Sequence, residues 1–178
     1  LRLLALWVAH AYQLGYKGGE KDALITLGSA PLDDPRFRTP LFEQLGEQRL
    51  EGAVTTDVAG RPEAHALRLD KEAPEAVRKA GLHRKIATTV FFESNGGQQK
   101  GEATLPEVRL AVGEPNLDLA NVDQCLEALA DACYYLHADK GRYRFEFKAN
   151  LNKLLADRRA SVTAPSSPVC SSLISRKL

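Results

Sequence analysis

The stretch YYLHADKGRYRFEF, residues 134–147, decides the fold of this chain. Two runs rich in Tyr, Phe and Arg flank the sequence ADKG at positions 138–141. Such runs around a turn that contains Gly are typical of a β-hairpin. Because side chains alternate along a strand, Arg142 and Arg144 should share one face, and the aromatic residues between and after them should share the other. We therefore expect a hairpin with an aromatic inner face.

Helical patterns precede the hairpin from Gly81 onward. Residues 82–95 carry apolar side chains at helical spacing, residues 98–103 read as a polar loop, and a helix from Thr104 to Gly113 has capping signals at both ends. A further helix after Asp118 repeats apolar residues every three or four positions up to the hairpin. The order helix, helix, helix, strand, turn, strand is that of a winged helix-turn-helix domain, which we assign to residues 81–160, with a closing helix at 150–160.

The first 80 residues predict a mainly helical subdomain with loops. An apolar stripe from Leu3 to Leu14 predicts a helix that ends at Gly15, and a short β-like run follows at 23–27. Asp34 and Pro35 signal the start of a helix that Pro40 should interrupt early. Residues 50–61 look irregular or short-stranded, and residues 62–81 predict one or two short helices broken at Pro74.

The two ends of the sequence differ in character from its middle. Residues 161–178 are rich in Ser and Pro without periodicity, which predicts a disordered tail or one foreign to the natural protein. The sequence begins with Leu1 and contains no Met, so we expect it to be a piece of a longer protein.

Composition limits how the chain can contact nucleic acid or membranes. A formal net charge of +1 provides no overall field toward nucleic acid or anionic lipid, so any such contact must be local. The apolar runs are shorter than the roughly 20 residues that a membrane span needs. Cys125 and Cys133 fall on one face of a helix and are expected in the core, and the unpaired cysteine pattern favours a reducing cytoplasm.

The sequence carries no recognisable catalytic or metal-binding motif. A phosphate-binding loop of the form GxxxxGK[ST] is absent. The scattered histidines lack the spacing of ligand pairs, so we expect them at the surface or its boundary. Asp57 and Asp70 stand in polar contexts, but their separation cannot be read from the sequence, so they do not define an acid–base pair. We predict neither catalytic nor metal-binding residues.

Charge argues against base reading by the helix before the hairpin. Between Leu110 and Asp139 there is no Lys or Arg, although the third helix of a winged helix normally faces a row of phosphates. The hairpin and its flank are basic. The candidate contacts to DNA or to a partner protein are Lys140, Arg142, Arg144 and Lys148. The alternative is that these cations form an ordinary solvated face.

The stretches RLDKEAP, GLHRKIATTVFFES, ATLPEVRLAV, CYYLHADKGRYRF and NLNKLLADRRA together give the chain a family resemblance. Over residues 1–160, and most strongly over 81–160, it resembles the C-terminal part of large predicted ATPases of the AAA superfamily, encoded near prokaryotic defence genes. The resemblance implies that residues 1–80 are a lid-like subdomain and that an ATPase core, which binds ATP and Mg²⁺, lies upstream. It implies that a basic lid residue approaches the nucleotide, for which Arg84 and Lys85 are the candidates.

Two hypotheses of function follow, with a third close to the first. The leading one is a non-catalytic lid and winged helix of an ATP-binding protein, which couples nucleotide state to partner or DNA contact, with a role in phage defence. The alternative is a stand-alone winged-helix regulator that binds DNA. A winged helix that contacts only protein, through its acidic third helix, resembles the first hypothesis in its expected behaviour.

Overall fold

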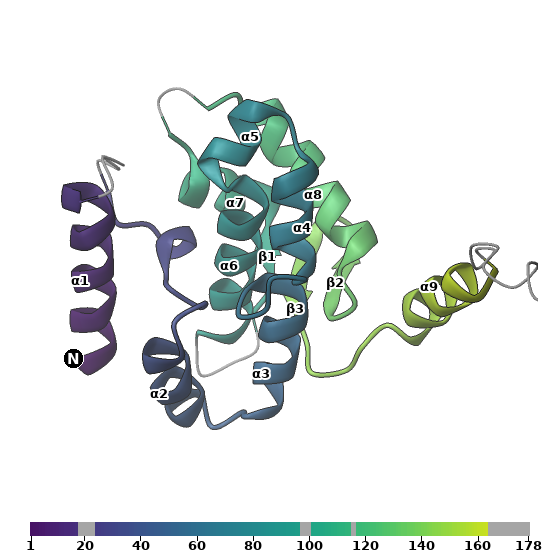
Figure 1. The fold of residues 1–178 in the computed structure, drawn as a ribbon, viewed down its shortest axis with the longest axis horizontal. Coiled ribbons are helices and arrows are strands. Elements are labelled where there is room, and N and C mark those ends of the chain that lie inside the picture. The colour runs from purple at the N-terminus through teal and green to yellow at the C-terminus, as the bar shows by residue number, and fades with distance from the viewer. Residues whose placement is uncertain (18–23, 97–100, 115–116, 164–178) are drawn as a thin grey trace, which may run out of the picture.

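Helices predominate in the structure, a computed structural model that describes residues 1–17, 24–96, 101–114 and 117–163 (Figure 1). The helices are α1 (Arg2–Lys17), α2 (Pro35–Leu45), α3 (Arg49–Ala53), α4 (His65–Glu72), α5 (Glu75–Ala80), α6 (Leu82–Asn95), α7 (Leu105–Val112), α8 (Leu119–Ala132) and α9 (Leu151–Thr163). A 3-10 turn, η1 (Leu27–Ser29), and a π-helical turn, η2 (Val54–Val58), complete the helical elements. None of the helices in these ranges is long and apolar enough to cross a membrane.

A small antiparallel sheet contains the predicted hairpin. Its strands are β1 (Ala103–Thr104), β2 (Leu136–Asp139) and β3 (Arg142–Phe145), in the order β1-β3-β2. Lys140 and Gly141 form the turn with φ angles of 48° and 75°. Two consecutive positive φ angles are what a two-residue type I′ turn requires, and Gly adopts them without strain. The hairpin prediction is therefore confirmed, with Phe145 buried and both arginines exposed.

Strand β1 was not expected. The sequence predicts a polar loop over 98–103, but Ala103 and Thr104 pair with Tyr143 and Arg142 of β3. Gly101 and Glu102 form no regular element, in agreement with a loop, and residues 98–100 lie outside the described residues. A two-residue strand is too short to show alternation, so only the free edge of β3 reveals its position.

Helix α6 runs through the middle of the fold and is buried along most of its length (Figure 1). Phe91 packs edge-on against Phe42 of α2 and Phe145 of β3. Trp7 of α1 stacks on Phe92 and meets Phe37. One hydrophobic cluster thus includes residues from both 1–80 and 81–160, and it also contains Cys125 and Cys133, as predicted.

Three predictions in the first 60 residues are wrong. Helix α2 continues through Pro40, because the lost N–H bond is a local cost and the buried side chains of Phe37, Leu41 and Phe42 favour the helix. Residues 50–61 contain α3 and η2, whose inner faces are buried. Leu24–Thr26 form no strand, and Leu27 starts η1 instead; Ala23, the first residue of that predicted run, lies outside the described residues.

Other boundaries agree more closely. The break at Pro74 is confirmed between α4 and α5, as are the limits of α6 and α7 and the start of α8 after Asp118; α8 ends at Ala132, whereas the predicted apolar pattern continues to the hairpin. Helix α1 passes Gly15 and ends at Lys17. Helix α9 runs to Thr163, beyond the expected boundary at 160, and residues 164–178 of the predicted tail are outside the described residues.

Candidate functional site

The basic residues of the hairpin lie in a network of ion pairs. Arg142 and Arg144 both donate to Glu102, at 3.1 and 3.0 Å, from the strand that pairs with β1. Arg144 also pairs with Glu146 at 2.7 Å. Two carboxylates therefore offset most of the positive charge that the sequence places on this strand face.

Two lysines extend the basic surface at the ends of the hairpin. Lys140 is exposed at the turn, and Lys148 is exposed after β3, where its ammonium lies 5.9 Å from the centre of the Phe147 ring. The structure thus brings Arg142 and Arg144 together and leaves the lysines to either side of them.

The outer face of α8 is acidic. Asp118, Glu127 and Asp131 are exposed along it. Asp123 is half-buried and receives a hydrogen bond of 2.9 Å from Arg109 of α7, whose guanidinium lowers the pKa of that carboxyl. Asp123 is thus already paired with a basic side chain, and Lys153 of α9 reaches the C-terminal end of α8, where its ammonium donates to the carbonyl oxygens of Ala130 and Cys133.

The nucleotide-contact candidates lie at the start of α6. The Arg84 backbone N–H donates to Asp70, and its side chain is half-buried. Lys85 is buried and its ammonium donates to Glu114 at 2.6 Å, across the loop after α7. Neighbouring positions on a helix point in different directions, so the structure does not bring these two side chains to one place.

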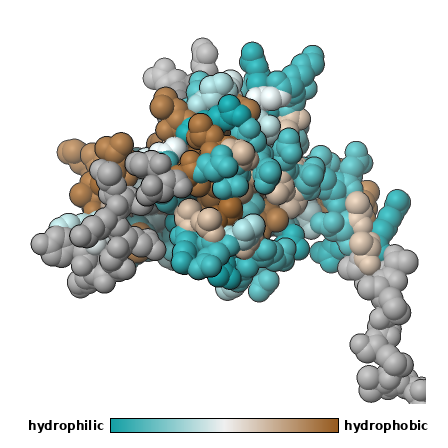
Figure 2. All heavy atoms as spheres, turned by 90° about the horizontal axis from the view of Figure 1, so that it is seen from above, coloured by the Kyte–Doolittle hydropathy of each residue, from teal (hydrophilic) through white to brown (hydrophobic). Residues whose placement is uncertain are grey.

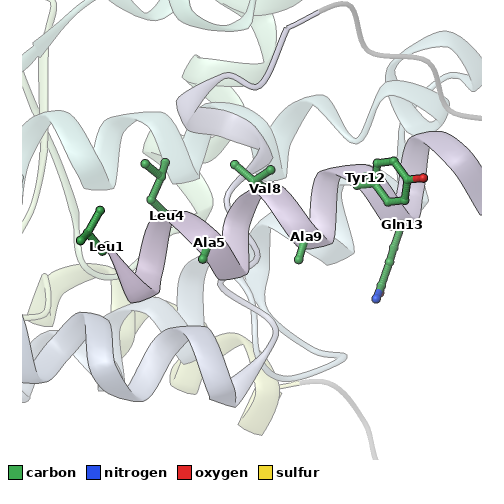
Figure 3. Close-up of a pocket in the computed structure, with 7 residues that line it drawn as sticks. All are labelled: Leu1, Leu4, Ala5, Val8, Ala9, Tyr12 and Gln13. Carbon is green, nitrogen blue, oxygen red and sulfur yellow. The ribbon is translucent and has the colours of Figure 1, made fainter.

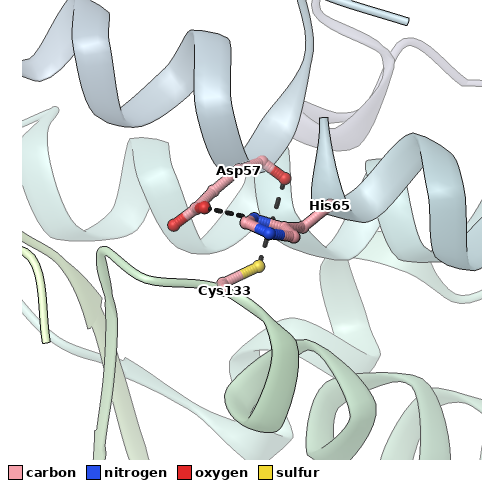
Figure 4. Close-up of side chains that lie close together, drawn as sticks. All are labelled: Asp57, His65 and Cys133. Carbon is pink, nitrogen blue, oxygen red and sulfur yellow. Dashed lines mark hydrogen bonds and ion pairs between the residues drawn. The ribbon is translucent and has the colours of Figure 1, made fainter. Parts of the chain in front are cut away.

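A buried polar cluster, formed by Asp57, His65 and Cys133, is the most unusual chemical feature of the fold (Figure 4). Asp57 lies in η2, His65 is the first residue of α4, and Cys133 directly follows α8. The Asp57 carboxylate accepts at 2.7 Å from Nδ1 of His65 and at 2.6 Å from the backbone N–H of Tyr135. Asp57 and Cys133 are 76 positions apart in the sequence. They lie together in the fold because η2 packs against the start of the hairpin, where the Cys133 thiol contacts the Asp57 carbonyl oxygen at 4.0 Å.

The thiol of this cluster is not an activated nucleophile. Cys133 is fully buried, and burial, with the nearby charge of Asp57, raises the pKa of its thiol well above the usual range. Lys153 and Arg68 act in the opposite direction but do not offset the burial. Since the thiolate and not the thiol is the reactive nucleophile, the burial and raised pKa of Cys133 argue against acyl transfer by this Cys–His–Asp set.

A second carboxylate–histidine pair joins α4 to α6. Asp70 accepts at 2.9 Å from Nδ1 of His83 and also from the backbone N–H groups of His83 and Arg84. Its charge therefore sits at the N-terminus of α6, where the helix dipole favours an anion. His83 lines a shallow groove together with Cys125, whose thiol pKa is raised by burial to about 12.

The histidine prediction is wrong for two residues. His65 and His83 are buried, not at the surface, because each is satisfied by an aspartate from another segment. The sequence presents Asp57 and Asp70 only as separate acids. No local sequence signal reveals these pairs, since the two members of each pair belong to different elements, η2 and α4 for Asp57 and His65, and α4 and α6 for Asp70 and His83.

The outward side of α1 is apolar. Leu1, Leu4, Val8 and Tyr12 lie along it with Ala5 and Ala9 between them (Figure 3). Leu4 is 59% exposed and Val8 46% exposed. Figure 2 shows hydrophobic atoms gathered at the end of the molecule where α1 lies. The opposite side of the same helix carries Trp7 into the core, so α1 is apolar on both sides.

Comparisons with protein-family models, with curated proteins and with solved structures found no match to this chain.

Proposed function

We propose that the chain is a non-catalytic, protein-contacting part of a larger ATP-binding protein of the AAA type, which couples nucleotide state to a partner. The observation that carries this proposal is the acidic outer face of α8. The partner surface that fits it is basic protein, not nucleic acid.

The order of elements supports a winged-helix reading of residues 81–160. Helix α6, strand β1, helices α7 and α8, and the β2–β3 hairpin follow one another, and β1 pairs with β3. In that reading α8 is the helix that would enter the major groove and the hairpin is the wing.

The charge of α8 opposes such an entry. Asp118, Glu127 and Asp131 would each approach phosphates without a counterion to release, so every contact would be repulsive. The same acidic side chains attract a surface rich in Lys or Arg, which steers association with a protein partner.

The apolar side of α1 supports attachment to a larger body. Exposed Leu4 and Val8 leave a hydrophobic stripe of the kind that normally marks an interface. In this proposal the ATPase core of the same protein, the one partner that the resemblance implies, covers that stripe.

Arg84 remains the nucleotide-contact candidate in this proposal. Its side chain is half-buried near a helix start, and its backbone is fixed by Asp70. Lys85 is held by Glu114 and would have to leave that ion pair to reach a phosphate.

Two observations test the proposal directly. The purified chain is expected to show no saturable ATP hydrolysis, and measurable turnover that follows substrate concentration would contradict the non-catalytic assignment. The genomic sequence upstream of the codon for Leu1 is expected to continue in frame and to encode a phosphate-binding loop; an upstream stop codon next to a start signal would refute the attachment.

A DNA-binding regulator is the second candidate, and the exposed Lys140 and Lys148 favour it. It predicts duplex binding that weakens steeply with salt and disappears in the double variant Arg142→Ala with Arg144→Ala. Retention of binding in that variant would show that the hairpin is not the contact.

A further inference from the structure

We propose that Asp57, His65 and Cys133 form a binding site for a divalent cation of the zinc class, which clamps η2 and α4 to the start of the hairpin. The proposal is independent of the function proposed above. It rests on ligand chemistry, spacing and burial.

The ligand atoms have the right spacing for a four-coordinate ion. One ligand atom from each residue lies within 4.8 Å of the other two, and the shortest separation that a hydrogen bond fixes is 2.7 Å, between Asp57 and His65. Zinc bonds of about 2.0 to 2.3 Å at tetrahedral angles place ligand atoms about 3.3 to 3.6 Å apart. The required separation falls inside this range, so changes of no more than about 1.5 Å in the distances between ligand atoms suffice.

The donor set selects the metal. One carboxylate oxygen, one imidazole nitrogen and one thiolate sulfur suit zinc and similar borderline ions. Calcium and magnesium need about six or more oxygen ligands, and in this cluster only Asp57 has a side-chain oxygen.

Charge balance fits complete burial. A dication with the Asp57 carboxylate, the Cys133 thiolate and a neutral His65 has no net charge, which minimises the cost of keeping it away from water. On binding, the Cys133 thiol releases its proton to solvent, His65 changes tautomer so that its proton moves from Nδ1 to Nε2, and metal bonds to Nδ1 of His65 and to the Asp57 carboxylate replace the hydrogen bond between them.

The surroundings hold the ligands in place. The Tyr135 backbone N–H fixes the second oxygen of Asp57, and the Tyr134 ring meets the His65 ring edge-on at 4.5 Å between centroids. Such contacts orient ligands at known metal sites. Asp57 also lies in a π-helical turn, a local distortion that is frequent at functional sites.

Cobalt(II) is the probe that tests the site, because a thiolate bound to it gives a charge-transfer band in the near ultraviolet. The reduced chain, residues 1–178, is titrated with Co²⁺ and then with Zn²⁺. We expect one equivalent of Co²⁺ to produce that band, with the strong visible bands of a four-coordinate ion, and Zn²⁺ to displace it. A folded wild-type chain that shows no such band would overturn the proposal.

Matched cysteine variants locate the ligand. The band should be lost in Cys133→Ser and kept in Cys125→Ser and Cys170→Ser, since Cys125 is also buried but lies outside the cluster. Loss of the band in Cys125→Ser or Cys170→Ser alone, or its persistence in Cys133→Ser, would place the metal elsewhere and refute the assignment. Circular dichroism checks that each variant is folded.

A second measurement does not depend on any cysteine variant. X-ray absorption spectroscopy of the zinc-loaded wild-type chain should find one sulfur atom at about 2.3 Å from the zinc, together with nitrogen and oxygen ligands. A first shell without sulfur would contradict the proposal.

The His65→Gln variant should bind Co²⁺ at least about tenfold more weakly, and unchanged affinity would also count against the site.

Discussion

Gly28 is the residue at which η1 lies close against α6. A Cβ at this position would lie 2.9 Å from the carbonyl oxygen of Lys85 and 3.0 Å from its Cβ. Both atoms belong to the buried, central part of α6, which cannot move aside easily. We expect Gly28→Ala to destabilise the protein by about 1 to 3 kcal/mol in urea unfolding.

Gly52 provides the matched control for that measurement. It lies within α3, and an added Cβ would meet nothing within 4 Å. Ala has the higher helix propensity, so Gly52→Ala should be neutral or stabilising by up to about 1 kcal/mol. Equal destabilisation by both substitutions would show that close approach at Gly28 is not the cause.

Asp70 anchors the start of α6 through a charged, buried network. Asp70→Ala removes the acceptor of two backbone N–H groups and of the His83 ring, and leaves them without partners. A loss of about 2 to 4 kcal/mol in unfolding free energy is expected. Glu72 is exposed on α4, the helix that also carries Asp70, and Glu72→Ala should change the unfolding free energy by less than about 0.5 kcal/mol. A similar loss of stability in both variants would contradict the anchoring role of Asp70.

At the residue scale, the sequence reveals which side chains are polar but not which polar side chains meet. Cys125 and Cys133 are correctly predicted as buried, because their helical spacing places them on the apolar face of α8. His65 and His83 are wrongly assigned to the surface, because their partners come from separate segments that only the tertiary fold brings close. Pairing of this kind lies beyond local pattern.

Helix α7 begins with a capping arrangement that depends on pH. The Thr104 backbone N–H and hydroxyl both donate to Glu107, at 2.8 and 2.7 Å, and these hydrogen bonds lower the pKa of Glu107 below its usual 4.5. A carboxyl with a lowered folded-state pKa stabilises the protein above its unfolded-state pKa, and this contribution is lost as the pH falls through the folded-state pKa.

The Glu107→Gln variant isolates that contribution. Its amide oxygen can accept the same hydrogen bonds but does not titrate. The wild type should gain in Tm relative to Glu107→Gln at neutral pH, and the difference should shrink at a pH well below 4.5. A difference that stays constant across this range would show that the Glu107 charge does not stabilise α7.

At the scale of elements, strong local signals predict structure well and weak ones fail. The caps at Asp34, Thr104 and Asp118 mark true helix starts, and the turn at Lys140–Gly141 marks the hairpin. Pro40 misleads, because core packing by α2 outweighs the loss of one hydrogen bond. Strand β1 and the π-helical turn η2 owe their form to neighbours in space, which no short sequence window contains.

At the scale of the whole molecule, charge is arranged so that neighbours cancel. Glu102 connects both arginines of the hairpin, and Asp123 is paired with Arg109. Glu102→Gln removes one carboxylate and frees Arg142 and Arg144 from it. We expect this variant to bind duplex DNA more strongly than the wild type at low salt, in a manner that added salt suppresses.

Fluorescence anisotropy with a labelled duplex measures that change. Gln keeps the size and polarity of the side chain, so the comparison isolates charge. Equal binding by wild type and Glu102→Gln would show that the ion pairs do not neutralise the hairpin in solution.

The sequence alone predicts the mainly helical fold, the hairpin and the sign of charge on α8. It cannot predict the ion pairs on Arg142 and Arg144, because Glu102 is about 40 residues away along the chain. Because these ion pairs are not visible in the sequence, the sequence predicts a stronger anion-binding surface on the hairpin than the fold provides.

The central claim is that α8 faces a protein and not a DNA groove, and duplex titration of the wild-type chain at low salt tests it most directly. Charge reversal by Glu127→Lys with Asp131→Lys serves as the comparison, since both residues are exposed on α8. If α8 faces a protein, the wild-type chain should show no saturable binding to the duplex, and the charge-reversed variant should gain binding. Saturable wild-type binding that charge reversal leaves unchanged would contradict it.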